Sequence, residues 1–150
     1  MDYFKEAEEL LYSVPRKERA IEQMQARKAR LMRKGAPTAP KGIDPSKPYT
    51  RASFENDTMN DLCELSDVCR KIAETQAALD EIKDAVAAIE SKELQLCLRL
   101  WYFERLPKER IAERIDRWSK TTVYNKRNEG VYEFARIYWG VSAEKPHRKN

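Results

Sequence analysis

Apolar residues recur at the spacing of an α-helix through residues 93–140, and polar breaks mark where one helix ends and the next begins. The first helix carries four large apolar residues at this spacing: Leu94, Leu98, Trp101 and Tyr102. We expect it to end near Arg105 and Leu106. Pro107 then opens a second helix, because its missing N–H and fixed φ suit a first helical turn.

The second helix is predicted to be short and to end at a polar break. Its apolar face has three members: Ile111, Ala112 and Ile115. The helical spacing of apolar residues is interrupted at residues 116–118, and Ser119 is a natural N-cap for a third helix. A short helix, a turn of about four residues and a helix opening on a polar cap are typical of a helix-turn-helix.

The segment IAERIDRWSKTTVYNKR, residues 111–127, resembles region four of bacterial sigma factors, with the loose pattern I-A-x-x-L-G-V-S-x-x-T-V-Y. Seven positions match: Ile111, Ala112, Ile115, Ser119, Thr122, Val123 and Tyr124. The chain departs at Asp116, where the family usually has glycine, and at Trp118, usually a small aliphatic residue. In general layout the whole chain resembles phage late-gene transcription activators of the RinA/ArpU kind.

The third helix would then be the recognition helix, whose N-terminal side chains meet base edges in the major groove. Val123 should face the core, together with Gly130 or Val131 and Phe134. Four residues on the opposite face are candidates for base reading: Lys120, Thr121, Tyr124 and Asn125. Lysine can donate to guanine, asparagine can pair with adenine, and the threonine methyl can meet that of thymine. The resemblance also implies base reading for Lys120, Thr121 and Asn125.

Other polar residues of this region suit phosphate contacts, which position a protein on DNA without specifying sequence. The candidates are Lys108, Arg110, Thr122, Lys126, Arg127 and Asn128. The alternative interpretation of both sets is an ordinary charged surface on a helical bundle. The tyrosines and tryptophan at positions 132, 138 and 139 are expected in the core or an interface.

Residues 1–34 are predicted to form amphipathic helices. The first has an apolar side made of Phe4, Ala7, Leu10, Leu11 and Val14. Pro15 should end or kink it, because proline inside a helix removes a hydrogen bond and clashes with the preceding turn. Residues 16–34 then carry eight basic side chains and a narrow stripe of Ile21, Met24 and Leu31. This second helix is either an auxiliary DNA contact or the solvated face of a helical hairpin.

Four prolines and two glycines interrupt the helical pattern over residues 35–54. These residue types cannot continue a helix, so we predict a loop or linker. Lys41, Lys47 and Arg51 give this segment a basic character, and nucleic acid is an alternative partner for it.

Residues 55–91 predict one long helix that begins near Asn56 and ends near Glu90. Leu65, Ile72, Leu79 and Val86 repeat every seven residues, with Leu62, Cys69, Ile82 and Ile89 on flanking positions. In this assignment of the heptad repeat, Gln76 and Lys83 occupy the positions labelled a. Polar residues at these positions fix the register between paired helices at some cost in stability. The seam is expected to be buried in a homo-oligomer, with a dimer favoured. The alternatives are a hairpin with residues 16–34 of the same chain, or both kinds of pairing together.

The chain has a net charge of +4, and its charged residues are unevenly distributed along the sequence. Residues 1–54 and 107–150 each carry an excess of five positive charges, whereas residues 55–96 carry an excess of seven negative ones. The basic C-terminal region gains from phosphate contacts, and the acidic middle is repelled by DNA.

Candidate chemistry is sparse. The sequence has no P-loop, no glycine-rich dinucleotide turn, no G-x-S-x-G and no H-E-x-x-H motif. We therefore do not expect the protein to be an enzyme. Cys63, Cys69 and Cys97 lack zinc-ligand spacing, and the one histidine is His147, so no metal or other cofactor is expected. Reduced thiols, and the lack of a long apolar run, favour a location in the cytoplasm rather than in a membrane. The resemblance to phage activators implies that this is the cytoplasm of a bacterial host.

We therefore predict an all-α protein with an N-terminal helical hairpin or coiled coil and a C-terminal three-helix domain containing the helix-turn-helix. The predicted segments are 1–34, 35–54, 55–91, 92–140 and a polar tail, 141–150. The expected function is sequence-specific binding of double-stranded DNA and regulation of transcription. The resemblance implies activation of phage late genes, with RNA polymerase as a further partner. The alternatives are a small terminase-type subunit that binds packaging-site DNA and an adaptor that binds polymerase or a sigma factor without reading DNA.

Overall fold

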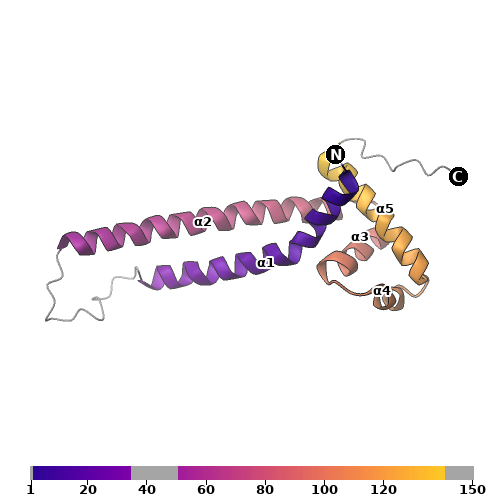
Figure 1. Cartoon of the computed structure of the whole chain (residues 1–150), viewed down its shortest axis with the longest axis horizontal. Helices are drawn as coiled ribbons and strands as arrows, with labels where there is room; N and C mark the ends of the chain where they lie inside the picture. Colours follow the sequence, from indigo (N-terminus) through magenta and orange to yellow (C-terminus); the bar gives the residue numbers. More distant parts are fainter. Residues whose placement is uncertain (1, 35–50, 141–150) are drawn as a thin grey trace. The chain divides into compact units, whose positions relative to one another are not determined.

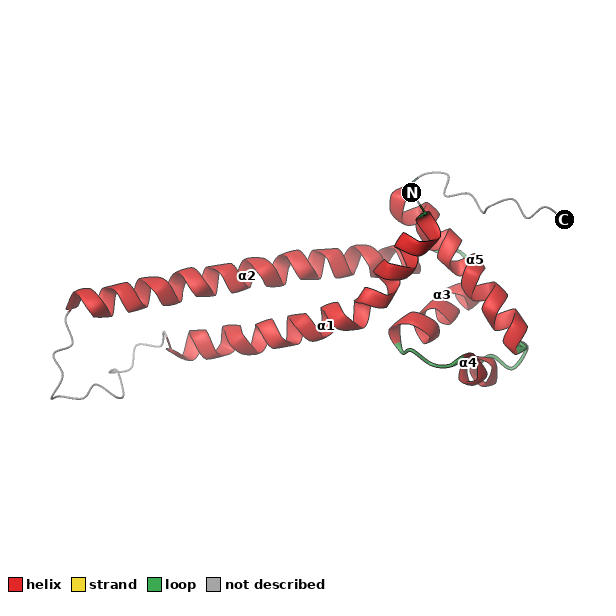
Figure 2. Ribbon diagram, in the orientation of Figure 1, coloured by secondary structure: helices red, strands yellow, loops and turns green. Residues whose placement is uncertain are grey.

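The computed structural model describes residues 2–34 and 51–140, and within these ranges every regular element is helical (Figure 2). The predicted tail and most of the predicted linker lie outside the described residues. The elements are α1 (Tyr3–Lys34), α2 (Arg51–Ala87), α3 (Lys92–Leu98), a π-helical segment η1 (Arg99–Phe103), α4 (Lys108–Arg114) and α5 (Lys120–Trp139). The all-α prediction is confirmed.

The chain divides into two compact units, and each contains part of α1 and part of α2. We call residues Arg19–Gln76 the hairpin unit. Met1–Glu18 together with Ala77–Asn150 form the second unit, which we call the head unit; it contains α3, η1, α4 and α5.

Helix α1 continues through Pro15, where the sequence predicted an end or a kink. Asp2 caps its start, since its Oδ1 accepts from the Lys5 N–H at 3.2 Å. Two residues before Pro15, the Ser13 hydroxyl donates to the Leu10 carbonyl and accepts from Lys17 Nζ, each at 2.6 Å. Leu11 and Val14 before the proline are fully buried, and their packing offsets the missing hydrogen bond.

Helix α2 begins at Arg51, ahead of the expected start near Asn56. Its inward-facing seam also differs from the predicted frame. The seam consists of Leu65, Val68, Ile72 and Thr75 in the hairpin unit and of Leu79, Ile82 and Val86, followed by Ile89 just past the helix end, in the head unit. All eight are buried or half-buried, at alternating spacings of three and four residues.

The prediction that Gln76 and Lys83 occupy seam positions is therefore wrong. Both side chains are exposed, and Lys83 Nζ lies 3.4 Å from the Glu18 carboxylate of α1. The sequence analysis placed Ile82 and Ile89 on flanking positions of the seven-residue repeat. In the structure they are the second buried position of each repeat, so Lys83 lies outside the buried seam.

In the hairpin unit, α1 and α2 run antiparallel and side by side (Figure 1). Arg27 of α1 pairs with Glu64 of α2, and Lys34 Nζ lies 3.8 Å from Asp61. These pairs are solvent-exposed and contribute little stability, but they fix which residues lie opposite one another. The two helices therefore cover each other within one chain, as the hairpin interpretation expected.

In the head unit, a buried glutamine joins α2 to α3. The Gln95 side chain, 5% exposed, donates to the Ala87 carbonyl at 3.2 Å and to the Ile89 carbonyl at 2.5 Å. Ser91 caps α3 by accepting from the Leu94 N–H at 3.3 Å. These bonds satisfy backbone groups that the end of one helix and the start of the next leave without partners.

Candidate nucleic-acid interface

Helices α4 and α5 form the helix-turn-helix that the sequence predicted. Helix α4 spans 7 residues and α5 spans 20, with residues 115–119 between them. Pro107 stands one position earlier than expected, as the N-cap of α4 (φ −67°, ψ 156°), and its carbonyl accepts from the Arg110 and Ile111 N–H groups. The turn closes where the Trp118 N–H donates to the Ile115 carbonyl at 2.9 Å.

Asp116 replaces the glycine of the sigma-factor pattern without a left-handed backbone. Among the described residues other than glycine, only Arg105 has a positive φ, at 54°. The chain instead leaves α4 through Ile115 at φ −116° and ψ 86°. The turn thus has no conformation that requires glycine at position 116.

Ser119 is the N-cap of α5, as predicted. Its hydroxyl accepts from the Thr122 N–H at 3.2 Å and lies 3.0 Å from the Thr122 hydroxyl. The Ser119 carbonyl accepts the first helical hydrogen bond, from the Val123 N–H at 2.9 Å. The cap fixes the first turn of α5, and the side chains at its N-terminal end with it.

An apolar cluster holds α4 and α5 against the preceding helix. Its buried members are Cys97, Leu100, Ile111, Ile115, Trp118 and Val123, with Trp101, Leu106 and Ala112 packed at the edge. Trp118 fills the place of the small aliphatic residue in the sigma-factor pattern, and only 8% of it is exposed. Gly130 lets α5 approach α3 closely, since a Cβ at that position would lie 3.0 Å from Leu98 side-chain atoms.

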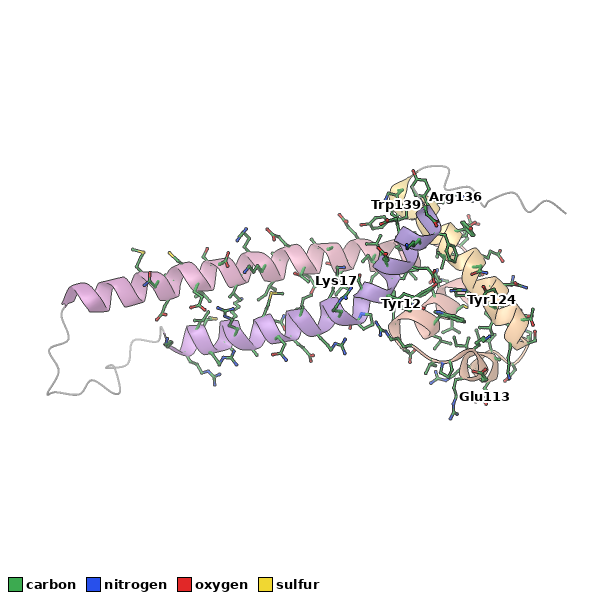
Figure 3. All side chains as sticks on the ribbon, viewed as in Figure 1. Tyr12, Lys17, Glu113, Tyr124, Arg136 and Trp139 are labelled. Carbon is green, nitrogen blue, oxygen red and sulfur yellow. The ribbon has the colours of Figure 1, made fainter. Side chains whose placement is uncertain are left out.

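The four predicted base-reading residues are exposed and lie together on the first two turns of α5. They are Lys120, Thr121, Tyr124 and Asn125. Their positions repeat at four residues, so they share one face, whereas Val123, Val131 and Phe134 are buried on the other. Lys120 Nζ lies 3.9 Å from the Glu109 carboxylate, an exposed pair that leaves the ammonium accessible to an acceptor. Tyr124 projects from the same helix (Figure 3).

The residues predicted to contact phosphate differ in their exposure to solvent. Lys108 and Arg110 are exposed on α4, and Arg110 Nη1 lies 3.5 Å from Glu113. Lys126 is half-buried and lies 3.5 Å from Glu129. Thr122 is half-buried, and its hydroxyl belongs to the cap of α5.

Arg127 is not placed as a phosphate contact, which corrects its assignment from sequence. It is 8% exposed, and its Nη1 donates to Glu8 Oε2 at 2.9 Å and to the Tyr102 hydroxyl at 3.4 Å. The Tyr102 hydroxyl itself donates to Glu8 Oε2 at 2.8 Å. The periodicity of α5 explains this placement, because position 127 follows the buried Val123 by four residues. Asn128 is half-buried and its Oδ1 has no hydrogen-bond partner, so phosphate contact is not favoured there either.

The Arg127 guanidinium also contacts aromatic rings, with the Phe4 ring 5.7 Å away and two others closer. Its central carbon is 4.6 Å from the centroid of the Trp101 ring and 4.8 Å from that of Tyr124. Cation–π attraction at these distances orients the Tyr124 ring on the exposed face of α5. We call Glu8, Tyr102 and Arg127 the buried triad; it connects α1 to α5.

Ionisation of the triad follows from its burial. Burial raises the pKa of the Tyr102 hydroxyl above its usual value, although Arg127 acts in the opposite direction. Burial disfavours the charge of Arg127, but the hydrogen bond to Tyr102 and the nearby Glu8 carboxylate leave its pKa raised. Arg127 therefore stays charged and Tyr102 stays neutral at physiological pH.

Glu8 was missed in the sequence analysis, although its position carried a signal. It lies four residues after Phe4 and three before Leu11, and so occupies the predicted apolar side of the first helix. A carboxylate on such a face needs a buried partner, which here comes from a residue 119 positions away.

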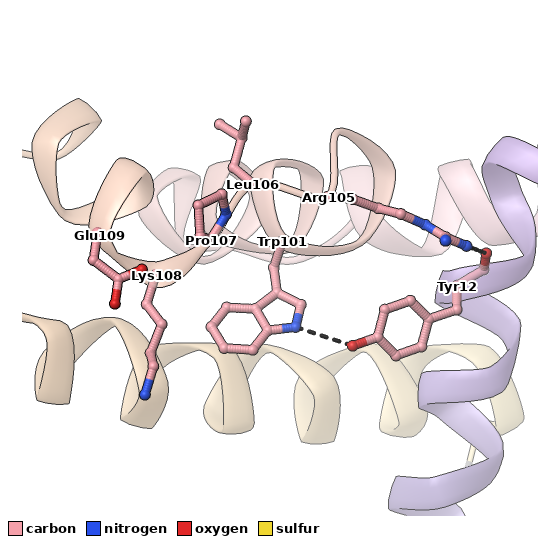
Figure 4. Close-up of a pocket in the computed structure, with 7 residues that line it drawn as sticks. All are labelled: Tyr12, Trp101, Arg105, Leu106, Pro107, Lys108 and Glu109. Carbon is pink, nitrogen blue, oxygen red and sulfur yellow. Dashed lines mark hydrogen bonds between the residues drawn. The ribbon is translucent and has the colours of Figure 1, made fainter.

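A shallow hollow of about 450 Å³ lies beside the helix-turn-helix in the head unit (Figure 4). It is lined by Tyr12, Trp101, Arg105, Leu106, Pro107, Lys108 and Glu109. Trp101 Nε1 donates to the Tyr12 hydroxyl at 3.3 Å, and Arg105 donates to the Tyr12 carbonyl at 3.2 Å. Nothing in the sequence predicted the π-helical turn or the left-handed Arg105 that form one side of the hollow.

Other kinds of site find no support in the described part of the chain. Within residues 2–34 and 51–140, no group of three or more histidine, cysteine or acidic residues is arranged to hold a metal ion. None of the helices in these ranges is both long and apolar enough to cross a membrane.

Comparison with known proteins gives no match to this chain among protein-family models, curated proteins or solved structures.

Proposed function

We propose that this protein binds a specific site on double-stranded DNA through the N-terminal half of α5. Lys120, Thr121 and Asn125 read base edges in the major groove, and Tyr124 packs beside them. Lys108, Arg110 and Lys126 contact phosphates and position the helix. The observation that carries the proposal is the exposure of all four candidate readers on one face of a helix whose other face is buried.

The chemistry of the exposed face suits base reading. An ammonium, an amide and a hydroxyl with its methyl group together offer donors, an acceptor and an apolar contact. These are the groups that distinguish base pairs in the major groove. The Ser119 cap and the buried triad hold them on a rigid helix, which lowers the entropy lost on binding.

Regulation of transcription is the biological role that we propose for this binding. It rests on the resemblance of residues 111–127 to region four of sigma factors and on the layout shared with RinA/ArpU-type activators. A promoter of phage or prophage late genes is then the expected target, with RNA polymerase as a second partner.

The proposal is tested by incubating the purified full chain with fragments of its source genome and sequencing the bound DNA at near-physiological salt. Salt is held fixed because phosphate contacts alone give non-specific binding that strengthens as salt falls. We expect a few sharp peaks upstream of an operon, lost in Lys120→Ala and in Asn125→Ala. Arg136→Ala is the matched control, because it removes an exposed charge from the far end of α5 and should keep the peaks.

Other outcomes of this experiment contradict the proposal in different ways. Peaks confined to a DNA-packaging locus would favour a terminase-type subunit. Absence of enrichment would favour an adaptor that binds polymerase without reading DNA. Enrichment that survives both substitutions would show that α5 is not the reading element.

A further inference from the structure

In the hairpin unit, α1 carries a row of exposed polar residues dominated by arginine. We call this row the arginine stripe, and its members are Arg19, Gln23, Ala26, Arg30 and Arg33. Their spacings alternate between four and three residues, so all five lie on one face of the helix. Every one of them is exposed to solvent.

The arginine stripe lies on the opposite side of α1 from the residues that are shielded from solvent. Within residues 19–34 the buried and half-buried residues are Ile21, Met24, Lys28 and Leu31. At about 100° per residue, the centres of the two sets are roughly 160° apart on the helix surface. The stripe therefore faces away from the interior of the hairpin.

The acidic residues of the hairpin unit do not neutralise the stripe. The four acidic residues of 58–76 pair with basic side chains outside the stripe, namely Arg27, Lys34, Arg70 and Lys71. Arg19, Arg30 and Arg33 form no ion pair with any residue that the structure describes.

The unit is left with a positive charge on α1. Residues 19–34 and 58–76 together contain eight basic and five acidic residues, an excess of three positive charges. The acidic side chains of α2 are matched by the four paired cations, so the excess belongs to α1. Glu22 is the one acidic residue among residues 19–34.

We propose that the arginine stripe contacts the phosphate backbone of double-stranded DNA. A guanidinium group can donate two parallel hydrogen bonds to a phosphate, and the Gln23 amide is a further donor. From position 19 to position 33 the stripe is about 21 Å long at a rise of 1.5 Å per residue. DNA carries a negative charge about every 1.7 Å along its axis, so several phosphates lie within such a length.

The composition of the stripe favours DNA over a lipid surface. A helix that binds a membrane surface inserts large apolar or aromatic side chains beside its basic ones, and the stripe has none. The sequence allowed residues 16–34 either to contact DNA or to form the solvated face of a hairpin, and the unpaired arginines favour the contact. This inference rests on the part of the proposed function that brings the chain to DNA.

The test is the salt dependence of DNA binding by the purified full chain. Affinity is measured by fluorescence anisotropy on a genomic fragment that the protein selects and on a scrambled copy, between about 50 and 200 mM salt. The stripe variant combines Arg19→Gln, Arg30→Gln and Arg33→Gln. We expect it to lower the slope of log affinity against log salt by about 3, and to weaken binding about tenfold on both fragments.

The matched control combines Arg27→Gln, Arg70→Gln and Lys71→Gln. It removes the same charge from the same unit at positions that are already paired, and it should change the slope by less than about 1. Circular dichroism checks that both variants keep their helices. Arg30→Gln alone should lower the slope by about 1 and replaces the triple variant if that protein does not fold.

Two results would overturn the inference: stripe variants that bind as the wild type does, and a control that loses as much as the stripe variant. Its failure is distinguishable from that of the proposed function. Lys120→Ala should weaken binding to the selected fragment alone, whereas the stripe variant should weaken binding to both. Loss in Lys120→Ala without loss in the stripe variant would therefore leave sequence reading by α5 standing. A protein that selects no fragment, yet loses salt dependence in the stripe variant, would leave the stripe standing instead.

Discussion

Arg127 shows how a single charged residue of α5 stabilises the structure. Its guanidinium is hydrogen-bonded to the Glu8 carboxylate and the Tyr102 hydroxyl and lies within 5 Å of the ring centroids of Trp101 and Tyr124. A buried charge is tolerated only with such partners, since removing one leaves the others unpaired in a medium of low polarity. Arg127 therefore determines how α5 sits against α1, and it orients one of the candidate base readers.

Replacing Arg127 tests this role. Arg127→Ala leaves the Tyr102 hydroxyl without one partner and the Glu8 carboxylate without its counter-charge. We expect the free energy of unfolding to fall by roughly 2–3 kcal/mol, as measured by urea denaturation. Arg136→Ala, an exposed residue of the same helix, should change it by less than about 0.5 kcal/mol. An equal, small effect of both substitutions would contradict a structural role for Arg127.

Cys97 is the second residue whose burial has a measurable consequence. Burial raises the pKa of its thiol to about 12, from an ordinary value of 9.0, although the positive charge of Arg127 acts to lower it. The folded state therefore holds this proton more tightly than the unfolded state does. The stability that follows is present below pH 9 and is lost as the pH rises from 9 towards 12.

We expect the Cys97 thiol to resist alkylation by iodoacetamide at pH 8 in the folded protein, while exposed Cys63 reacts. Mass spectrometry of the labelled peptides measures both residues in one sample. In urea both should react, which is the internal control. Labelling of Cys97 at the rate of Cys63 without denaturant would show that the core of the helix-turn-helix is open.

At the scale of elements, the helix-turn-helix depends on how α5 begins. Ser119 supplies the cap, and the turn before it closes through one backbone hydrogen bond. Ser119→Ala should lower the free energy of unfolding by about 1 kcal/mol, because the Thr122 N–H loses its acceptor. Ser119→Asp keeps an acceptor and adds a favourable charge at the helix N-terminus, so it should be close to neutral. Thermal unfolding is measured for the wild type and both variants. If Ser119→Asp were as unstable as Ser119→Ala, the capping role would be contradicted.

The elements themselves were largely predictable from local pattern. Apolar spacing and the cap at Ser119 predicted both helices of the helix-turn-helix and the core residues Ile111, Ile115 and Val123, because these depend on neighbours in sequence. Cys97, Leu100 and Trp118, which are also buried in this core, were not predicted. The frame of the α2 seam was not predicted, since seven-residue repeats of apolar residues allow two frames until the partner helix is known. The sequence also left open whether Pro15 ends the first helix or only kinks it, and α1 continues across it.

The candidate site could be predicted only in part, for a related reason. The exposed readers Lys120 and Asn125 follow from helix periodicity alone. The burial of Arg127 depends on a carboxylate far away in sequence, and neither the π-helical turn nor the backbone of Arg105 has a local sequence signature here. Contacts with residues far away in sequence decide which charged residues of α5 face solvent.

At the scale of the whole molecule, the charge distribution along the chain agrees with the proposed DNA contact in the head unit. The region from residue 107 onwards is basic and would gain from phosphate contacts, whereas residues 55–96 are acidic and would be repelled by DNA.

The most direct test of the central claim is the affinity of the protein for one genomic fragment that it selects and for a scrambled copy, at one fixed salt concentration. We expect Lys120→Ala and Asn125→Ala each to cost about 1–3 kcal/mol on the selected fragment and much less on the scrambled one. Arg136→Ala should bind both fragments as the wild type does. Equal losses on both fragments, or no loss at all, would contradict sequence reading by α5.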